Sequence, residues 1–563
     1  MRWELCHHLD REKFPVAQFK LDQSMLKLNE AYPPVLTIRR DPEASTGNMS
    51  HIQIGWPQLP PTASQTQYDV LRQWLKDCDA EHLECSRQKP THLPTRLMHL
   101  KGQGRSTISL YETQPTDAFE YIALSHPWGK GPHFRTTLAN VEAHRKGIGF
   151  EALPATFRHA VVVSRELGID YLWIDSVCII QGEGGDFNQE AKRMEDVFSS
   201  AFCVLAASSA RGQNDGFLNP RSHARQHLTF DRIGGLPKFF LGPFMDNFNQ
   251  DVLEAPLSRR GWVLQERALA RRTIYFTDSQ TYWECGKTVR CETLTRMDNK
   301  LVSFLGDAHF PSKLSNESTS RGEKILFYEG LYSLYTRLEF TRISDRPIAI
   351  AGLEKRLIRD LKAHGGFGVF DDGRSLLQRS LLWRRGREVT ALTRIDPDPS
   401  SVSVPTWSWM AYDGGVDYLD LPLGGVHWLP STEAIQSPWA SEGTDTWHTD
   451  DGKESVELEA CARPFAAAPG SRGLTTHDEI MIVYDNPNMM NREDGDLMCV
   501  VVGSARNKGS IEEDMVHYVL VIALSQGLSY AEDGRQRYER VGVGRMKGKF
   551  LDLKSPAQTV VVR

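Results

Sequence analysis

The sequence predicts an α/β protein in which a parallel-sheet core is elaborated by helices and followed by a β-rich C-terminal region. Between residues 118 and 215, short apolar runs alternate with amphipathic helical patterns, which is typical of βα units in a parallel sheet. Residues 216–424 are mainly helical in pattern, and residues 425–563 contain short alternating runs that indicate an antiparallel sheet or a small barrel. A chain of 563 residues is too long for one hydrophobic core, so we expect several domains.

Residues 1–117 form a lead-in of mixed texture with one clear helical pattern, YDVLRQWLKDCDAEHLECSRQ, at 68–88. Cys78, His82 and Cys85 recur in it at the spacing i, i+4 and i+7, which places them on one face of a helix. Cysteine and histidine are zinc ligands, but a structural zinc site needs four ligands, and no second pair is obvious in the sequence. The sequence therefore favours a packed helical face, and we expect no metal site.

The core region contains five predicted elements in the order strand, helix, strand, helix, strand, at 121–129, 153–168, 171–180, 186–201 and 202–208. The first helix has recognisable boundary signals, because Pro154 lies near its first turn and Gly168 stands where a glycine commonly follows a helix. Parallel strands all end at the same edge of a sheet. Side chains that follow them therefore project into the crevice where ligands bind.

Side chains with catalytic potential gather at this expected carboxyl edge. They are Ser125, His126 and Trp128 from the first strand, Asp175 and Cys178 from the second, and Glu190 beyond the glycine-rich loop 182–185. Each also has a structural explanation: the aspartate caps backbone amides, the cysteine packs as a small hydrophobe, the histidine is hydrogen-bonded in a core, and the glutamate complements a helix N-terminus. Their convergence on one edge is what predicts a site.

Charge and composition exclude several classes of protein. The net charge of −6 and the pI of about 6.3 leave no basic footprint for nucleic acid, and the arginine-rich stretch 258–272 is interpreted as a solvated helix face with ion pairs. The N-terminus lacks the apolar segment of a signal peptide, and the apolar run 518–524 is too short to span a bilayer. The 9 scattered cysteines do not form a disulfide framework. We therefore expect a cytoplasmic protein that binds neither nucleic acid nor membrane.

Several blocks of the sequence resemble the fungal heterokaryon-incompatibility (HET) domain. YIALSHPWG at 121–129, the stretch 136–181 ending in YLWIDSVCIIQ, and EAKRMEDVFSSAFCVLAAS at 190–208 resemble its three core blocks. The similarity includes WLKDCDAEHLEC and LPTRLMHL before the core, and PLSRRGWVLQERALARRTIYFTDSQTYWEC, SDRPIAIAGLE and PTWSWMAY after it. It covers residues 68–412, so the C-terminal region lies outside it.

The resemblance implies both a fold and an activity. Members of the family act in non-self recognition and programmed cell death when incompatible hyphae fuse, and their core has been related to TIR domains, flavodoxin-like units of which some hydrolyse NAD⁺. By this resemblance Glu190 is the candidate catalytic glutamate, which would stabilise an oxocarbenium-like state as the nicotinamide–ribose bond breaks. The candidate substrate-binding residues, with tryptophans as an aromatic wall and an arginine for phosphate, are Trp128, Gly129, Trp173, Gln181 and Arg193.

Three functions remain open from the sequence alone. The first is an incompatibility factor that hydrolyses NAD⁺ as its substrate, requires no cofactor, and associates with itself or with an incompatibility partner protein. The second is a small-molecule enzyme of secondary metabolism, acting as a cyclase, acyl transferase or hydrolase. In it Cys178 or Ser125 is the nucleophile, His126 the base and Asp175 the residue that orients the base. The third is a non-catalytic interaction protein whose carboxyl-edge residues are structural.

Overall fold

The fold is given by a computed structural model, and the chain divides into two compact units, Met1–Phe310 (unit 1) and Pro311–Arg563 (unit 2). The residues described are 18–22, 24–31, 33–42, 52–56, 58–85, 92–101, 106–221, 227–231, 238–297, 318–396, 403–439, 456–466, 479–491, 497–505, 511–525 and 534–563. The finer domain boundaries expected after residues 117, 215 and 424 stay predictions.

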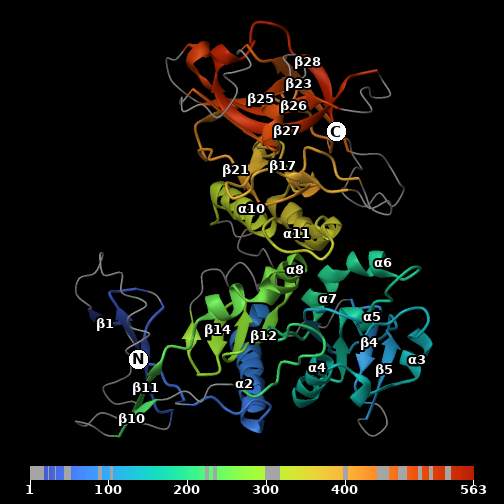
Figure 1. The fold of residues 1–563 in the computed structure, drawn as a ribbon, viewed down its shortest axis with the longest axis vertical. Coiled ribbons are helices and arrows are strands. Elements are labelled where there is room, and N and C mark those ends of the chain that lie inside the picture. Colours follow the sequence, from blue (N-terminus) through green and yellow to red (C-terminus); the bar gives the residue numbers. More distant parts are fainter. Residues whose placement is uncertain are drawn as a thin grey trace. The chain divides into compact units, whose positions relative to one another are not determined.

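Unit 1 is built around a ten-stranded mixed sheet in the order β15-β14-β13-β12-β9-β6-β8-β4-β5-β7 (Figure 1). Its strands are β4 (Arg96–His99), β5 (Thr107–Glu112), β6 (Ile122–Ser125), β7 (Ile148–Gly149), β8 (Tyr171–Trp173), β9 (Cys203–Ala206), β12 (Arg272–Phe276), β13 (Thr281–Cys285), β14 (Thr288–Cys291) and β15 (Arg296–Met297). The strands β8, β6, β9 and β12 pair in parallel, and the others extend the sheet antiparallel on both sides. Every residue of β6, β9 and β12 is buried, as expected of a parallel sheet covered on both faces.

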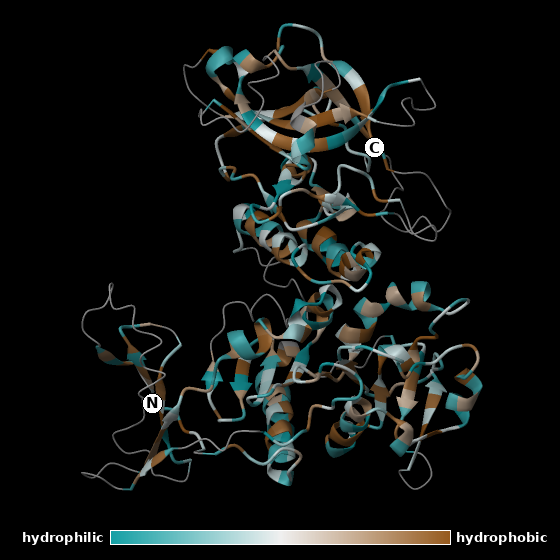
Figure 2. Cartoon of the chain, viewed as in Figure 1, coloured by the Kyte–Doolittle hydropathy of each residue, from teal (hydrophilic) through white to brown (hydrophobic). Residues whose placement is uncertain are grey.

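The helices of unit 1 connect and cover this sheet. They are α2 (Gln65–Glu81), α3 (Val141–Lys146), α4 (Ala155–Glu166), α5 (Asp175–Cys178), α6 (Phe187–Ala191), α7 (Met194–Ser200) and α8 (Gly261–Leu269). Pro154 is the N-cap of α4, and Gly168 lies just beyond its C-cap with a φ of +78°, which confirms both predicted boundary signals. Figure 2 shows hydrophobic and hydrophilic residues alternating along these helices, as expected of helices that bury one face.

Two predicted elements of the core are shorter than their sequence patterns indicated. The strand expected over 171–180 ends at Trp173, and the residues that follow form the single helical turn α5. An apolar run of this length does not distinguish a strand from a buried helical turn, which explains the error. The helix expected over 186–201 is interrupted at Lys192 and Arg193, so α6 and α7 are separate.

The arginine-rich stretch 258–272 is not a solvated helix face, contrary to the sequence-based interpretation. It contributes to η7 (Pro256–Arg259), forms α8 and begins β12, and Arg267 and Arg272 are only 8% and 0% exposed. Arg267 donates to the two carboxylate oxygens of Glu284 at 2.9 and 2.7 Å. The sequence pattern predicted that water surrounds these arginines, whereas Arg267 is paired with a buried carboxylate.

A second sheet in unit 1 combines the lead-in with residues inserted between β9 and β12. It has five strands in the order β1-β2-β3-β11-β10, with bounds Phe19–Asp22 (β1), Met25–Leu28 (β2), Leu36–Arg40 (β3), Leu228–Phe230 (β10) and Phe239–Pro243 (β11). Arg39 of β3 forms a buried ion pair with Asp246 at 2.8 Å. The lead-in and the inserted residues therefore share one structural element.

Unit 2 begins with helices and short strand pairs. Its helices are α10 (Arg321–Tyr335), α11 (Ala351–Leu361) and α12 (Leu376–Ser380). The short strands are β16 (His364–Gly366), β17 (Val369–Asp371), β18 (Trp383–Arg385), β19 (Thr393–Arg394), β20 (Tyr412–Asp413) and β21 (Val416–Tyr418). A capping box between Ser320 and Glu323 starts α10. Short strands therefore lie between the helices of a stretch whose pattern was mainly helical.

The C-terminal part of unit 2 is β-rich, as the sequence predicts. Its strands are β22 (Val426–Trp428), β23 (Leu458–Pro464), β24 (Ile480–Tyr484), β25 (Leu497–Ala505), β26 (Val516–Leu524), β27 (Arg537–Lys547) and β28 (Gln558–Val562). The pairings β25-β26-β27-β28-β23-β25 close a ring. On β25, Val500 belongs to one apolar cluster and Val501 to another, so successive side chains fill opposite faces of the sheet.

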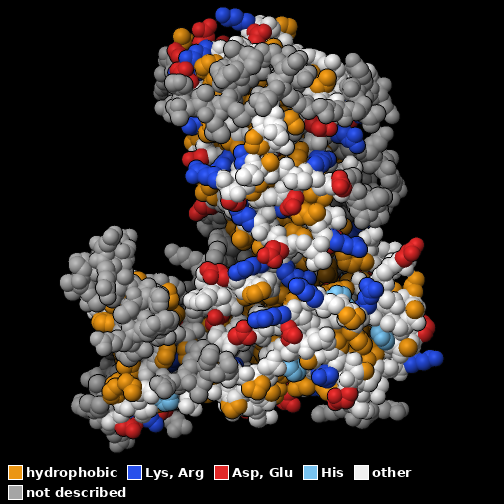
Figure 3. All heavy atoms as spheres, in the orientation of Figure 1, with side chains coloured by type: hydrophobic (Ala, Val, Ile, Leu, Met, Phe, Trp, Pro, Cys, Tyr) orange, Lys and Arg blue, Asp and Glu red, His pale blue; other side chains and the backbone are white. Residues whose placement is uncertain are grey.

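Charged side chains of both signs are interspersed over the displayed face of each unit (Figure 3). This mixture agrees with the modest net charge of −6. None of the helices in the described ranges combines the length and the apolar character needed to cross a membrane.

Candidate functional site

Polar side chains surround the carboxyl ends of the parallel strands in unit 1. β6 lies at the centre, with β8 paired on one side and β9 on the other, so the sheet order turns at β6. Open α/β sheets bind ligands at such a point, where the chain leaves neighbouring strands in opposite directions. The residues at this edge, called the carboxyl-edge cluster below, are Ser125, His126, Trp128, Asp175, Arg260 and Glu266.

His126 directly follows β6 and is only 4% exposed. Neither of its ring nitrogens has a hydrogen-bond partner, and Nδ1 lies 3.8 Å from Asp175 Oδ1. The ring packs edge-on against Phe157, with 5.0 Å between ring centroids. Burial lowers the pKa of His126 to about 4, an effect that Asp175 opposes and Arg260 reinforces. The imidazole is therefore neutral at neutral pH and keeps an unused acceptor nitrogen.

Asp175 is fixed by hydrogen bonds from neighbouring segments. Its Oδ2 accepts from Trp128 Nε1 at 2.7 Å, and its Oδ1 accepts from the Ser176 N–H at 2.6 Å. The Gln181 side chain donates to the backbone oxygen of Asp175 at 3.3 Å. Asp175 is the first residue of α5 rather than its N-cap, which is Ile174; it accepts from one backbone amide of the turn, and it also orients the indole of Trp128 at the carboxyl edge.

Glu266, on α8, is a residue of the cluster that sequence reasoning missed. Its Oε2 is shielded from solvent and makes no hydrogen bond of normal geometry, and neither does the Ser125 Oγ, although the two groups lie close enough to interact. Burial raises the pKa of Glu266 to about 7, while the Ser125 hydroxyl and Arg260 oppose the rise and Asp175 adds to it. A carboxyl group with this pKa exchanges a proton near neutral pH, which is the property of a catalytic acid or base.

Arg260 connects α8 to the end of β6. Its Nη1 donates to the backbone oxygen of His126 at 2.7 Å, although the two residues are 134 apart in the sequence. The one sequence signal for Glu266 was its place as the single acid of the arginine-rich stretch 258–272. Such a stretch more often lies on a solvated face. Only the folded chain brings this helix to the carboxyl edge.

Glycines allow the loops after β6 and β9 to touch beside the cluster. Gly129 has a φ of +82°, and a Cβ atom there would lie 2.7 Å from Gly212 Cα. The Gln213 N–H donates to the backbone oxygen of Trp128 at 3.3 Å. Gly129, predicted to bind substrate, therefore has a backbone reason for being glycine.

The structure places Glu190 and Arg193 in a separate group. Glu190 is 6% exposed, its Oε1 accepts from Thr95 Oγ1 at 2.6 Å, and it lies 3.7 Å from Arg193 Nη1. Arg193 also donates to Thr95 Oγ1 at 2.5 Å. Within the described part of the chain, no hydrogen bond or ion pair joins Glu190 or Arg193 to the carboxyl-edge cluster. Their shared partner, Thr95, directly precedes β4.

Cys178 and Trp173 lie inside the core. Cys178 is 1% exposed, its Sγ faces Leu172 O at 3.9 Å, and burial raises the pKa of its thiol to about 12. Trp173 is 2% exposed and packs edge-on against Phe198. A thiol with this pKa is protonated at neutral pH, which does not favour a nucleophile. A buried indole likewise presents little surface to a substrate.

The segment that carries the carboxyl-edge cluster matches a known family. The family model described as heterokaryon incompatibility protein (HET) matches residues 121–266. Residues 121–266 therefore carry a HET domain. Searches among curated proteins and among solved structures found no match. The HET domain begins just before β6 and extends to Glu266 on α8, so it includes every member of the carboxyl-edge cluster. The match therefore supports an incompatibility-type family for this segment.

Proposed function

We propose that the HET domain hydrolyses the nicotinamide–ribose bond of NAD⁺, with Glu266 as the carboxylate that stabilises the transition state. The observation that carries this proposal is the solvent-shielded, unpartnered Oε2 of Glu266, whose pKa burial raises to about 7. The parallel strands, in the order β8-β6-β9-β12, are the second, first, third and fourth along the chain. This order supports a flavodoxin/TIR-like core, in which ligands bind where the order turns.

The chemistry explains why such a carboxylate is useful. Hydrolysis breaks the bond between ribose C1′ and the nicotinamide nitrogen, the bonding electrons leave with neutral nicotinamide, and water captures the oxocarbenium-like ribose. An ionised Glu266 in a poorly hydrated site stabilises the positive charge on the ribose more strongly than it would in water. The proton of the attacking water passes to the carboxylate and then to solvent, which a pKa near 7 permits in both directions.

Other members of the cluster supply binding groups. Trp128 offers an indole held in one orientation by its hydrogen bond to Asp175, which suits stacking on a nicotinamide or adenine ring. The unpartnered Ser125 Oγ and His126 ring nitrogens are available to ribose hydroxyl groups. We assign Glu190 a structural role, because it is buried and already bonded to Thr95.

A Ser–His–Asp or Cys–His–Asp mechanism has less support. The 3.8 Å between His126 Nδ1 and Asp175 Oδ1 is longer than a hydrogen bond, and Ser125 Oγ has no basic partner. Cys178 is buried with a raised pKa. The long His126–Asp175 distance and the protonated, buried thiol of Cys178 therefore favour a mechanism that uses the carboxylate of Glu266. Hydrolysis of NAD⁺, triggered by self-association or by a partner protein, would give an incompatibility-type protein a direct route to cell death.

The test is the release of nicotinamide from NAD⁺ by the full chain, measured at low and high protein concentration. We expect release by the wild-type protein and a loss of about 1000-fold in kcat for Glu266→Gln, which keeps the side-chain shape but removes the charge. Glu190→Gln is the matched control, since it changes a buried glutamate of the same domain, and it should keep its rate within about 10-fold.

Two results would overturn the proposal. Activity that persists in Glu266→Gln and disappears in a folded Glu190→Gln variant would move the chemistry to Glu190. The absence of nicotinamide release by folded wild-type protein at every concentration would remove NAD⁺ as the substrate.

A further inference from the structure

The end of α2 and the end of β13 bring together four side chains that are common metal ligands. They are Cys78, His82, Cys85 and Cys285, called the Cys/His cluster below. One ligand atom from each lies within 4.8 Å of the others, and His82 Nδ1 is 3.4 Å from Cys285 Sγ. Among the described residues this is the one such group of three or more His, Cys, Asp or Glu side chains. Cys285 is the fourth side chain of the cluster, which the sequence pattern did not reveal.

The local backbone explains how the helical part of the cluster forms. His82 is the C-cap of α2, and its N–H donates to Cys78 O. The chain then turns through η2 (Leu83–Cys85), where the Cys85 N–H donates to His82 O at 3.0 Å. This turn directs Cys85 back toward Cys78 on the last turn of the helix. Leu83, at the outside of the turn, is 86% exposed.

The three cysteines of the cluster are buried. Cys78, Cys85 and Cys285 are 1%, 1% and 0% exposed, and all three are free of disulfide bonds. Thiols are weak hydrogen-bond donors and acceptors, so their mutual contacts account poorly for three sulfur atoms and an imidazole directed at one point. Thiolate and imidazole are the ligands that Zn²⁺ prefers in proteins.

We propose that Cys78, His82, Cys85 and Cys285 bind one Zn²⁺ ion in a closed structural site. Tetrahedral zinc with bonds of about 2.3 Å to sulfur holds its ligand atoms about 3.8 Å apart. The four ligand atoms of the cluster, within 4.8 Å of one another, need only small side-chain adjustments to reach this separation. Four protein ligands leave no open position for substrate, so the ion is structural rather than catalytic.

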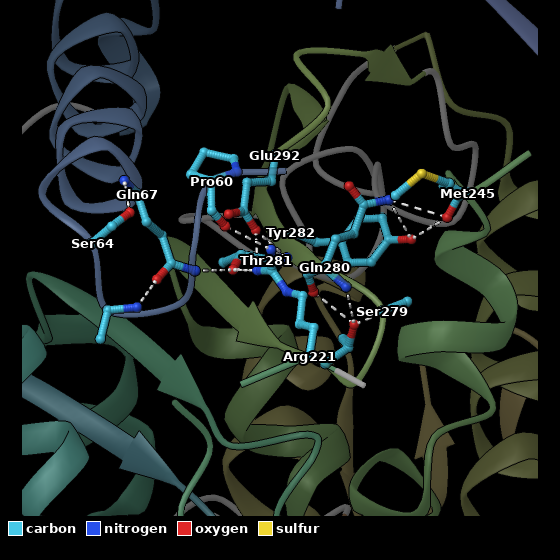
Figure 4. Close-up of polar contacts among 12 residues, drawn as sticks. Pro60, Ser64, Gln67, Arg221, Met245, Ser279, Gln280, Thr281, Tyr282 and Glu292 are labelled. Atoms are coloured by element: carbon cyan, nitrogen blue, oxygen red, sulfur yellow. Dashed lines mark hydrogen bonds and ion pairs between the residues drawn. The ribbon is translucent and has the colours of Figure 1, made fainter. Parts of the chain in front are cut away.

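The zinc ion completes the attachment of α2 to the sheet. At the start of the helix, Gln67 donates to Thr281 Oγ1 of β13 at 3.0 Å (Figure 4). Further along, the rings of Trp74 and Trp283 approach to 6.4 Å. Figure 1 shows α2 running beside this part of the sheet. The Cys/His cluster joins the two elements where the helix ends.

The proposed site also connects segments on both sides of the HET domain. α2 precedes the matched residues 121–266, and β13 follows them. β13 pairs with β12, which pairs with β9 and directly follows α8. Zinc therefore stabilises the part of the sheet beside α8, the helix that carries Glu266. Residues outside the matched range 121–266 thus contribute to the same folded domain.

The first test is the metal content of the full chain, purified without chelators and measured by mass spectrometry. We expect one zinc per chain. After exchange with Co²⁺ we expect the visible absorption of tetrahedral cobalt with thiolate ligands. Protein that is folded but free of metal, that contains iron in place of zinc, or that holds these cysteines in a disulfide would overturn the proposal.

Variants of His82 test the site without removing a buried thiol. His82→Cys keeps four zinc ligands and should retain the ion. His82→Ala should lower zinc affinity by at least about 100-fold, measured by competition with a chromogenic chelator, because it removes a direct ligand. Cys203→Ser, a buried cysteine of β9, is the matched control and should retain zinc. Equal zinc affinity in wild-type and His82→Ala protein would contradict the assignment.

Discussion

Glu266 and Glu284 are two shielded carboxylates of unit 1 with opposite environments. Glu284, on β13, is 1% exposed, and its oxygens accept from Arg267 Nη2 at 2.7 Å, from Arg267 Nε at 2.9 Å and from the Tyr275 hydroxyl. Glu266 precedes Arg267 on α8, yet its Oε2 has no hydrogen-bond partner and burial raises its pKa to about 7. Two successive residues of one helix therefore serve different parts of the domain.

The two environments distinguish a carboxylate that stabilises the fold, Glu284, from one that is available to a ligand, Glu266. A buried carboxylate with two charge-assisted bonds to an arginine is held in the folded state and has little capacity left for a ligand. A shielded carboxyl without a partner destabilises the fold when it ionises, so its presence at the carboxyl edge requires another explanation. Binding of a ligand that develops positive charge supplies one. The comparison predicts that substitution by glutamine lowers the free energy of unfolding at Glu284 and raises it at Glu266 near neutral pH.

The largest effect on stability is expected for Glu284→Gln. It leaves Arg267 as a buried cation without its carboxylate, and we expect a loss of about 3–5 kcal/mol in the free energy of unfolding. Glu266→Gln, the neighbouring control, should change this free energy by less than about 1 kcal/mol at pH 4.5, because Glu266 is protonated there in the folded chain and the neutral glutamine resembles it. The free energy of unfolding of both variants is measured by urea denaturation, with hydrogen exchange in β12 and β13 as the probe of local stability. Equal losses would show that Glu266 is also a structural residue.

The second prediction concerns His126, which is buried and neutral. Its pKa in the folded state is lowered to about 4, mainly by burial, from an ordinary value of 6.5. The unfolded chain therefore binds the proton first, so this histidine contributes stability above pH 6.5 that is lost as pH falls toward 4. The full contribution is roughly 3 kcal/mol.

Comparison with His126→Asn isolates that contribution. Between pH 7 and pH 4, the wild-type protein should lose about 3 kcal/mol more unfolding free energy than the variant, measured by urea denaturation at each pH. Acidic groups elsewhere titrate in both proteins and cancel in the difference. Parallel stability curves for the two proteins would mean that His126 titrates normally and is hydrated in the folded state.

The sequence predicted those features that depend on local patterns. The apolar runs of β6 and β9 and the boundary signals of α4 are local, and so are Ser125, His126 and Asp175 at the ends of strands. Their strand assignments place them at one edge because parallel strands share a direction. The NAD⁺ chemistry and the roles of these residues stay predictions.

Features that depend on distant contacts could not be predicted in this way. Cys285 lies beside Cys78 because β13 pairs next to β12, and no spacing in the chain encodes that contact. Glu266 reaches the carboxyl edge because α8 precedes β12, while Arg267 is drawn to Glu284. An arginine-rich helix therefore looked solvated, although its charges are paired with residues of other elements.

The smallest effect, and the one that most sharpens the comparison, is the pH dependence of Glu266. Its folded-state pKa of about 7 lies above the ordinary value of 4.5, so the folded chain binds the proton more tightly than the unfolded chain. The stability from protonated Glu266 is complete below pH 4.5 and is lost as pH rises through 7, which is opposite in sign to His126. Because Glu266 as a whole residue is partly exposed, although its Oε2 is shielded, we expect about 2 kcal/mol.

Relative to wild-type protein, Glu266→Gln should therefore gain about 2 kcal/mol of unfolding free energy between pH 4.5 and pH 8. The same ionisation should appear in catalysis, because the proposed mechanism needs the carboxylate. In wild-type protein, kcat/KM for nicotinamide release should rise through pH 7 and level off above it. A stability difference that does not change with pH would show that Glu266 is ionised throughout this range. It would then resemble Glu284, and the distinction between the two carboxylates would fail.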